Sequence, residues 1–219
     1  MSDIFHVDPL WYPPANILYH GHQKLQTETD RQHIKQIRET MSAAVMIIGI
    51  NKITSENYRL QLVDPQEQTP DVRTMRLIEE NDRTNTLDVQ EVEVVTLEKN
   101  SPENVDTFLK RTKLSGKKAY PKTTIILCHI DKTMQNNKSW YDIHQSLKGV
   151  SLSNDVYVLA RIDPKKQVYH LVKVHPDLEL VEFDIREELF SRPKQKVLKM
   201  GRGANPAIKP TDEIHIPFE

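Results

Sequence analysis

The segment that most constrains the fold is Leu87–Leu97, which reads LDVQEVEVVTL and is rich in valine. Its composition and length predict a central β-strand. Side chains two residues apart share one face of a strand, so Glu91 and Glu93 are expected on the same face. The other members of that face are all apolar: Leu87, Val89, Val95 and Leu97. Carboxylates on such a face are costly to bury unless they pair with cations or bind a metal ion.

Periodic patterns on both sides of this strand predict a mixed core. An apolar stripe at helical spacing predicts a helix from about residue 30 to residue 48, capped by Thr29 or Asp30 and ended by Gly49. Ser101-Pro102 has the signature of a second helix start. The apolar run at 123–130 predicts a buried strand. With strands at 58–63 and 71–78, the expected order is helix, three strands, helix, strand.

We predict an α/β (α+β) fold, with a central mixed sheet flanked by helices and a C-terminal α+β extension. The predicted parts are an irregular N-terminal arm (1–28), a core (29–130) and an α+β extension with a basic tail packed on the core (131–219). In the extension we expect a helix at 140–147, a hairpin of 155–162 with 167–174, and a strand with a helical turn within 178–190.

Composition narrows the class of protein. The chain has 219 residues and no apolar run of about 18, so no membrane span is expected. Its N-terminus has neither the basic start nor the apolar stretch of a secretory signal. The single Cys128 has no partner for an internal disulfide. These features predict an intracellular, cytoplasmic protein.

A third carboxylate, Asp71, follows Pro70 at the start of the preceding strand. A hairpin turning within residues 79–86 would bring Asp71 close to Gln90–Val95. Asp71, Glu91 and Glu93 would then form one cluster, and hard oxygen ligands of this kind suit Mg²⁺ or Mn²⁺.

The alternative interpretation is an exposed sheet surface without a metal. Arg73 and Arg76 on the preceding strand would then pair with Glu91 and Glu93.

Pro70-Asp71 followed by Glu91-Val92-Glu93 resembles the motif of the PD-(D/E)XK nuclease superfamily. The resemblance covers about residues 29–130 and implies a restriction-endonuclease-like core in which Asp71 and Glu91 bind the catalytic metal. The family's usual lysine is replaced by Glu93, as in some restriction endonucleases of that family. A lysine from the following helix, Lys110 or Lys113, would then act in its place.

Basic residues are concentrated in two segments. Lys110–Lys122 has no acidic residue, and neither does Ser191–Pro210. Such segregation in a chain with net charge −1 predicts a surface for phosphate backbones, on the same side as the carboxylates. The alternative is a solvated loop. The predicted nucleic-acid-binding residues are Lys110, Arg111, Lys113, Lys117, Lys118 and Lys122.

The resulting hypothesis is a metal-dependent phosphodiesterase, an endonuclease acting on DNA or RNA, with DNA slightly favoured. Its expected metal ligands are Asp71, Glu91 and Glu93, with Mg²⁺ or Mn²⁺, and Lys113 completes the catalytic set. The alternative hypothesis is a catalytically inactive protein of nuclease fold that binds nucleic acid, a protein partner or a second copy.

Overall fold

The computed structural model describes residues 10–62, 70–81, 84–115, 120–130, 138–150, 152–190, 197–199 and 212–214. The chain forms two compact units. Unit 1 comprises Met1–Glu91 and Glu187–Glu219, and unit 2 comprises Val92–Arg186. The predicted boundary at residue 130 lies inside unit 2. Within the described ranges, no helix combines the length and apolarity needed to cross a membrane.

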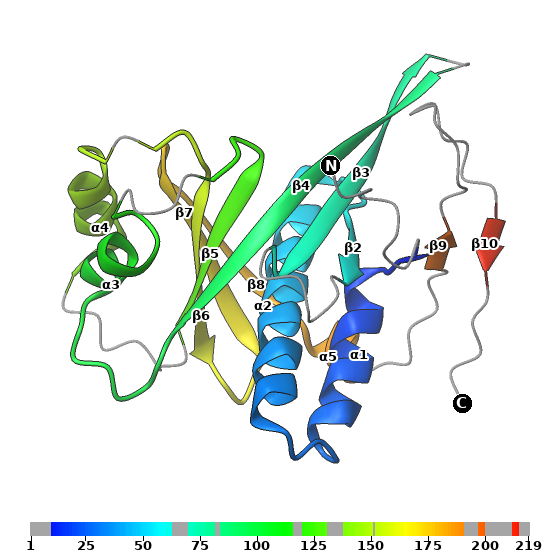
Figure 1. Ribbon diagram of the computed structural model, residues 1–219, viewed down its shortest axis with the longest axis horizontal. Helices are drawn as coiled ribbons and strands as arrows, with labels where there is room; N and C mark the ends of the chain where they lie inside the picture. The colour runs from blue at the N-terminus through cyan, green and yellow to red at the C-terminus, as the bar shows by residue number, and fades with distance from the viewer. Residues whose placement is uncertain are drawn as a thin grey trace. The chain divides into compact units, whose positions relative to one another are not determined.

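Helices and strands are interspersed along the chain (Figure 1). The helices are α1 (Pro14–Leu25), α2 (Arg31–Thr54), α3 (Val105–Thr112), α4 (Trp140–Leu147) and α5 (Arg186–Phe190). The strands are β1 (Leu10–Trp11), β2 (Arg59–Leu62), β3 (Val72–Asn81), β4 (Thr84–Leu97), β5 (Thr124–Ile130), β6 (Val156–Asp163), β7 (Val168–His175), β8 (Glu179–Asp184), β9 (Val197–Lys199) and β10 (Asp212–Ile214).

Seven strands form one mixed sheet in the order β2-β3-β4-β5-β6-β7-β8. Strands β5 and β6 are parallel, whereas the pairs β2–β3, β6–β7 and β7–β8 are antiparallel. The predicted α+β class with a central mixed sheet is therefore confirmed. The four core strands predicted from the sequence are neighbours in this sheet, and β4 contributes residues to both units.

In unit 1, the N-terminal segment was predicted to be irregular, and this prediction is wrong for residues 14–25, which form α1. Pro13 is the N-cap and Pro14 takes the first helical position, where a missing N–H costs nothing. Helix α1 packs closely on α2, because a Cβ added at Gly21 would lie 2.7 Å from Cγ of Met41.

Helix α2 begins as predicted and ends later than predicted. The carboxylate of Asp30 accepts hydrogen bonds from the backbone N–H of Gln32 and His33, which caps the helix. Gly49 does not stop it, because the segment around Gly49 is buried and the hydrogen-bonded turns continue to Thr54. The helix ends at Ser55, which adopts the left-handed conformation with φ of 58°.

Unit 2 contains an apolar core between the sheet and helices α3 and α4, which lie on one face of strands β5–β7 (Figure 1). Leu109 and Leu147 contribute from the helices, and Ile126, Cys128 and Val158 from the strands. Burial raises the pKa of the Cys128 thiol to about 12. The packing explains why the run at 123–130 is almost entirely apolar.

The predicted start of the helix at Ser101-Pro102 is wrong by a few residues. Helix α3 begins at Val105 with Asn104 as its N-cap, while the Ser101 hydroxyl accepts a hydrogen bond from the Glu103 N–H. The sequence pattern was locally plausible, but Ser101 organises the turn before the helix.

The predicted elements of the extension are confirmed. Helix α4 spans the predicted residues and has a capping box formed by Ser139 and Asp142. Strands β6 and β7 form the predicted hairpin, and β8 with α5 supplies the predicted strand and helical turn.

Candidate functional site

Strand β4 places Glu91 and Glu93 two residues apart. Glu93 is only 3% exposed and lies between the fully packed Val92 and Val94. Glu91 is half-buried. The apolar face predicted around them is buried only toward its C-terminal end, since Leu97 is 2% exposed and Val89 is 40% exposed. A carboxylate as buried as Glu93 requires a compensating charge.

That compensation comes from Lys113 at the C-terminal end of α3. Its Nζ lies 2.7 Å from Oε2 of Glu93, and the two side chains are 17% and 3% exposed. The same ammonium lies 5.9 Å from the centre of the Tyr120 ring, within the range of a cation–π contact. The backbone N–H of Lys113 is hydrogen-bonded to the carbonyl of Leu109, which fixes the start of this side chain. Two predicted catalytic residues are thus brought together.

Asp71 is half-buried and immediately precedes β3. The alternative interpretation assigned Arg76 to the β4 glutamates, and this assignment is wrong. Arg76 Nε instead donates to Asp88 at 3.1 Å, and Nη1 donates to Glu56 at 3.0 Å. Because strand side chains alternate between faces, Asp88 lies on the face of β4 opposite to Glu91 and Glu93. Arg76 therefore pairs with that opposite face.

The predicted metal ligands Asp71, Glu91 and Glu93 differ in how well they suit a divalent cation. Mg²⁺ usually keeps several waters and needs only one or two carboxylates from the protein. In the described part of the chain, no three His, Cys, Asp or Glu side chains are grouped so that they could hold a metal ion. Asp71 and Glu91 supply the two carboxylates that such a magnesium site would use, with water as its other ligands. The carboxylate of Glu93, in contrast, already binds the Lys113 ammonium group.

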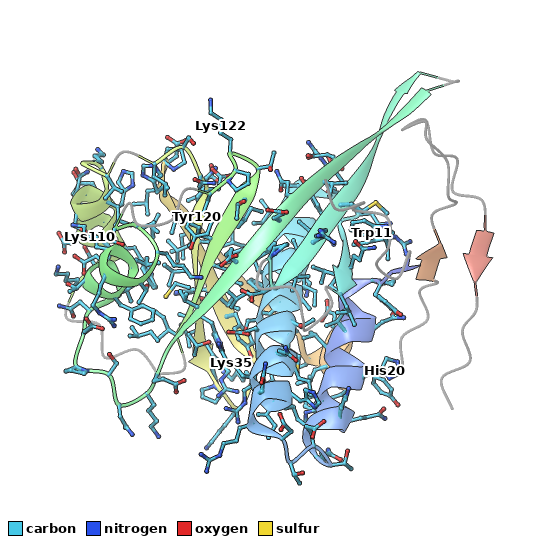
Figure 2. The ribbon with its side chains drawn as sticks, in the orientation of Figure 1. Trp11, His20, Lys35, Lys110, Tyr120 and Lys122 are labelled. Carbon is cyan, nitrogen blue, oxygen red and sulfur yellow. The ribbon has the colours of Figure 1, made fainter. Side chains whose placement is uncertain are left out.

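Apart from Lys113, the predicted nucleic-acid-binding residues fall into three groups. Arg111 donates to both carboxylate oxygens of Glu103, at 2.8 and 2.6 Å, and this pairing lowers the pKa of Glu103. Lys110 and Lys122 form no ion pair with another described residue, and Lys122 points away from the ribbon in Figure 2. Lys117 and Lys118 lie outside the described residues.

A second lysine–carboxylate pair was not predicted from the sequence. Lys138 Nζ lies 2.7 Å from Oδ2 of Asp106, whose side chain is 5% exposed. Burial alone would raise the pKa of Asp106, but the hydrogen bond and the positive charge of Lys138 help to outweigh burial, and the pKa is lowered. An acidic residue in the first turn of a helix is common, so Asp106 gave no signal that it would meet a lysine 32 positions later.

Comparison of the chain with family models, curated proteins and solved structures gave no match.

Proposed function

We propose that this chain is a metal-dependent phosphodiesterase that cleaves nucleic acid. The observation that carries the proposal is the pairing of Glu93 with Lys113 at 2.7 Å. The motif on β4 has a glutamate where the PD-(D/E)XK pattern has a lysine, and a lysine from the following helix reaches that same residue. The restriction-endonuclease-like core is part of the proposal, supported by the strand order β2-β3-β4-β5.

In this proposal, Asp71 and Glu91 would hold Mg²⁺ or Mn²⁺ and Glu93 holds Lys113. The metal would supply a Lewis acid for the scissile phosphate and lower the pKa of a bound water. DNA is slightly favoured over RNA as the substrate.

Lys113 carries the part of the chemistry that belongs to the chain itself. Its ammonium is a hydrogen-bond donor that binds the Glu93 carboxylate and lies near the Tyr120 ring. In this proposal the Lys113 ammonium would stabilise a phosphate oxygen on which negative charge increases during cleavage. Because Glu93 holds the ammonium in place beforehand, little reorganisation is needed when the charge develops.

The test is a cleavage assay with single- and double-stranded DNA and RNA in Mg²⁺ or Mn²⁺. The parent protein should cleave at least one substrate, and chelation by EDTA should stop the reaction. Glu91→Gln should abolish cleavage, because it removes one charge from the proposed metal site while preserving shape. Lys138→Met is the matched control, since it removes a lysine from an equally short ion pair at a different place on α3.

A parent protein that cleaves none of the four substrates in either metal would contradict the proposal. Mn²⁺ binding gives an independent reading, because a ligand that binds the folded state alone raises the melting temperature. If Mn²⁺ stabilises the parent protein but not Glu91→Gln, the metal site would be supported even though these nucleic acids are not its substrates. Cleavage that persists in Glu91→Gln would exclude the assigned ligand.

The second candidate is a non-catalytic protein of the same fold that binds nucleic acid or a protein partner. The observation that favours it is that Glu93 and Lys113 neutralise each other and so form a complete structural pair. Under this candidate, DNA binding would survive EDTA and Glu91→Gln. Lys110→Glu with Lys122→Glu would weaken binding to all sequences alike, because phosphate contacts carry no base information.

A further inference from the structure

The last strand of the seven-stranded sheet, β8, is hydrogen-bonded on one side only within the described part of the chain. The backbone N–H of Ile185 donates to the carbonyl of Gln167, which fixes the alternation of hydrogen-bonded pairs between β7 and β8. By that alternation, Val181 and Phe183 point their backbone groups toward β7. Leu180 and Glu182, which alternate with them, point theirs outward.

Leu180 and Glu182 are therefore the outward-facing residues at the middle of β8. In the described part of the chain, no hydrogen bond engages the backbone N–H or C=O of either residue. Their side chains are also open, since Leu180 is 52% exposed and the Glu182 side chain is 63% exposed. The six residues of β8 pair with β7 without a register shift and contain no proline or lysine. A bulge, a proline or a lysine on an edge strand usually prevents it from pairing with a further strand.

The charge along this edge selects among possible occupants. Glu179 is exposed and forms no ion pair with a described residue, because its cross-strand neighbour Lys173 binds Asp155 at 3.0 Å. The Glu182 carboxylate lies 3.1 Å from Nε2 of the His170 imidazole. The open edge therefore carries a carboxylate on each face of the strand, with Glu182 beside Leu180 on one face and Glu179 on the other.

A second copy of β8 is a poor occupant for this edge. Pairing two β8 strands in parallel register, or antiparallel about Glu182, would place glutamates of one copy beside glutamates of the other, and like charges across a strand pair are destabilising. A nucleic-acid backbone is disfavoured by the same carboxylates. An extended segment with lysines or arginines alternating with apolar residues would satisfy the outward backbone groups. Its basic side chains would lie on the face of Glu182, and its apolar side chains on the face of Val181 and Phe183.

We propose that the outer edge of β8 is a docking site for a basic, extended peptide segment of a partner protein, which binds by adding a strand to the sheet. The inference is independent of the phosphodiesterase proposal, because it uses no residue of the Glu93–Lys113 site.

The experiment measures binding of a labelled peptide, acetyl-Lys-Val-Lys-Val-Lys-Val-Lys-amide, to the full chain by fluorescence anisotropy. Leu180→Pro is the informative variant, because proline removes an outward N–H and leaves the bonds to β7 in place. Leu180→Val is its matched control, since it keeps both the N–H and an apolar side chain. Leu180→Pro should weaken binding about tenfold, the order expected for one lost hydrogen bond with local rearrangement. Leu180→Val should change it less than about threefold.

Three further measurements separate strand addition from simple charge attraction. Glu182→Lys and a peptide with glutamate in place of lysine should each abolish binding. A peptide N-methylated at alternate residues keeps its charge, so its failure to bind would support backbone pairing without relying on any variant. The amide NMR signals of Leu180 and Glu182 should shift on peptide addition. Equal binding of the methylated peptide, shifts confined to other strands, or no binding by the parent would overturn the proposal.

Discussion

Helix α3 carries one lysine–carboxylate pair at each end, and the two pairs are almost identical in length. At the start of the helix, Lys138 Nζ lies 2.7 Å from Oδ2 of Asp106. At its end, Lys113 Nζ lies 2.7 Å from Oε2 of Glu93. The Lys138 side chain is 36% exposed, whereas that of Lys113 is 17% exposed. A short distance to a buried carboxylate therefore does not by itself indicate a catalytic group. What separates the pairs is that Glu93 lies on β4, two residues after Glu91.

The sharpest test of this comparison is catalytic. Lys113→Met should lower the cleavage rate by about 10²–10³-fold, as does removal of a preorganised group that stabilises transition-state charge in other enzymes. Lys138→Met should leave the rate within about threefold of the parent. Single-turnover assays at saturating substrate would measure both. Equal losses in the two variants would make Lys113 a structural residue like Lys138.

The next largest effect is expected on stability. Glu93→Gln leaves the Lys113 ammonium without its anionic partner, which should cost about 3 kcal/mol of unfolding free energy. Urea denaturation monitored by circular dichroism would measure the loss. Adding Lys113→Met should recover part of it, because the stranded charge is removed. A cost below about 0.5 kcal/mol would mean that the pair is well solvated.

Asp106→Asn should cost less, about 1 to 2 kcal/mol, because Lys138 is more exposed and its charge is better hydrated. The effect should depend on pH with a defined sign. The pKa of Asp106 is lowered from its ordinary value of 3.8 in the folded state, so the stabilisation is present above that value. It is lost as the pH falls below it. The difference between parent and variant should therefore shrink between pH 6 and pH 3, and a constant difference would contradict this account.

The smallest effect concerns the exposed pair at Arg111. Arg111→Gln should leave the free energy of unfolding almost unchanged, since exposed ion pairs contribute little. It should also leave the salt dependence of DNA binding nearly unchanged, because the Arg111 guanidinium is paired with Glu103 and would not contact a phosphate. Lys110→Gln should instead flatten the slope of log affinity against log salt by about one unit. Titrations at several salt concentrations would compare the two variants.

The sequence predicted the elements whose patterns are set by burial. The valine-rich β4, the apolar β5 and the stripe of α2 each follow from one-sided or two-sided burial. Strands β4 and β5 and the start of α2 were found near their predicted positions. Helix α1 was missed because three prolines were interpreted as irregular chain, although Pro14 occupies the one helical position that favours proline. Gly49 was interpreted as a stop because the burial of its surroundings is a tertiary property.

For the candidate site, the sequence supplied residue types but few partners. Lys113 was one of two lysines proposed to act beside Glu93, and only the three-dimensional structure distinguishes it from Lys110. The Arg76 partners were predicted wrongly, because alternation along β3 and β4 does not determine which acidic group an arginine's long side chain will reach. Asp106 and Lys138 meet through the packing of two helices, which local patterns do not encode.

The burial of Cys128 gives this chain an internal reporter of opening. Its thiol is fully buried in the core of unit 2, and its pKa of about 12 leaves almost no thiolate at neutral pH. A thiol reagent can therefore modify it only when that core opens. Because it is the chain's single cysteine, the labelling rate reports one event at one place. Where reclosing is faster than labelling, the ratio of that rate to the rate of an unfolded control gives the opening free energy of unit 2 without denaturant.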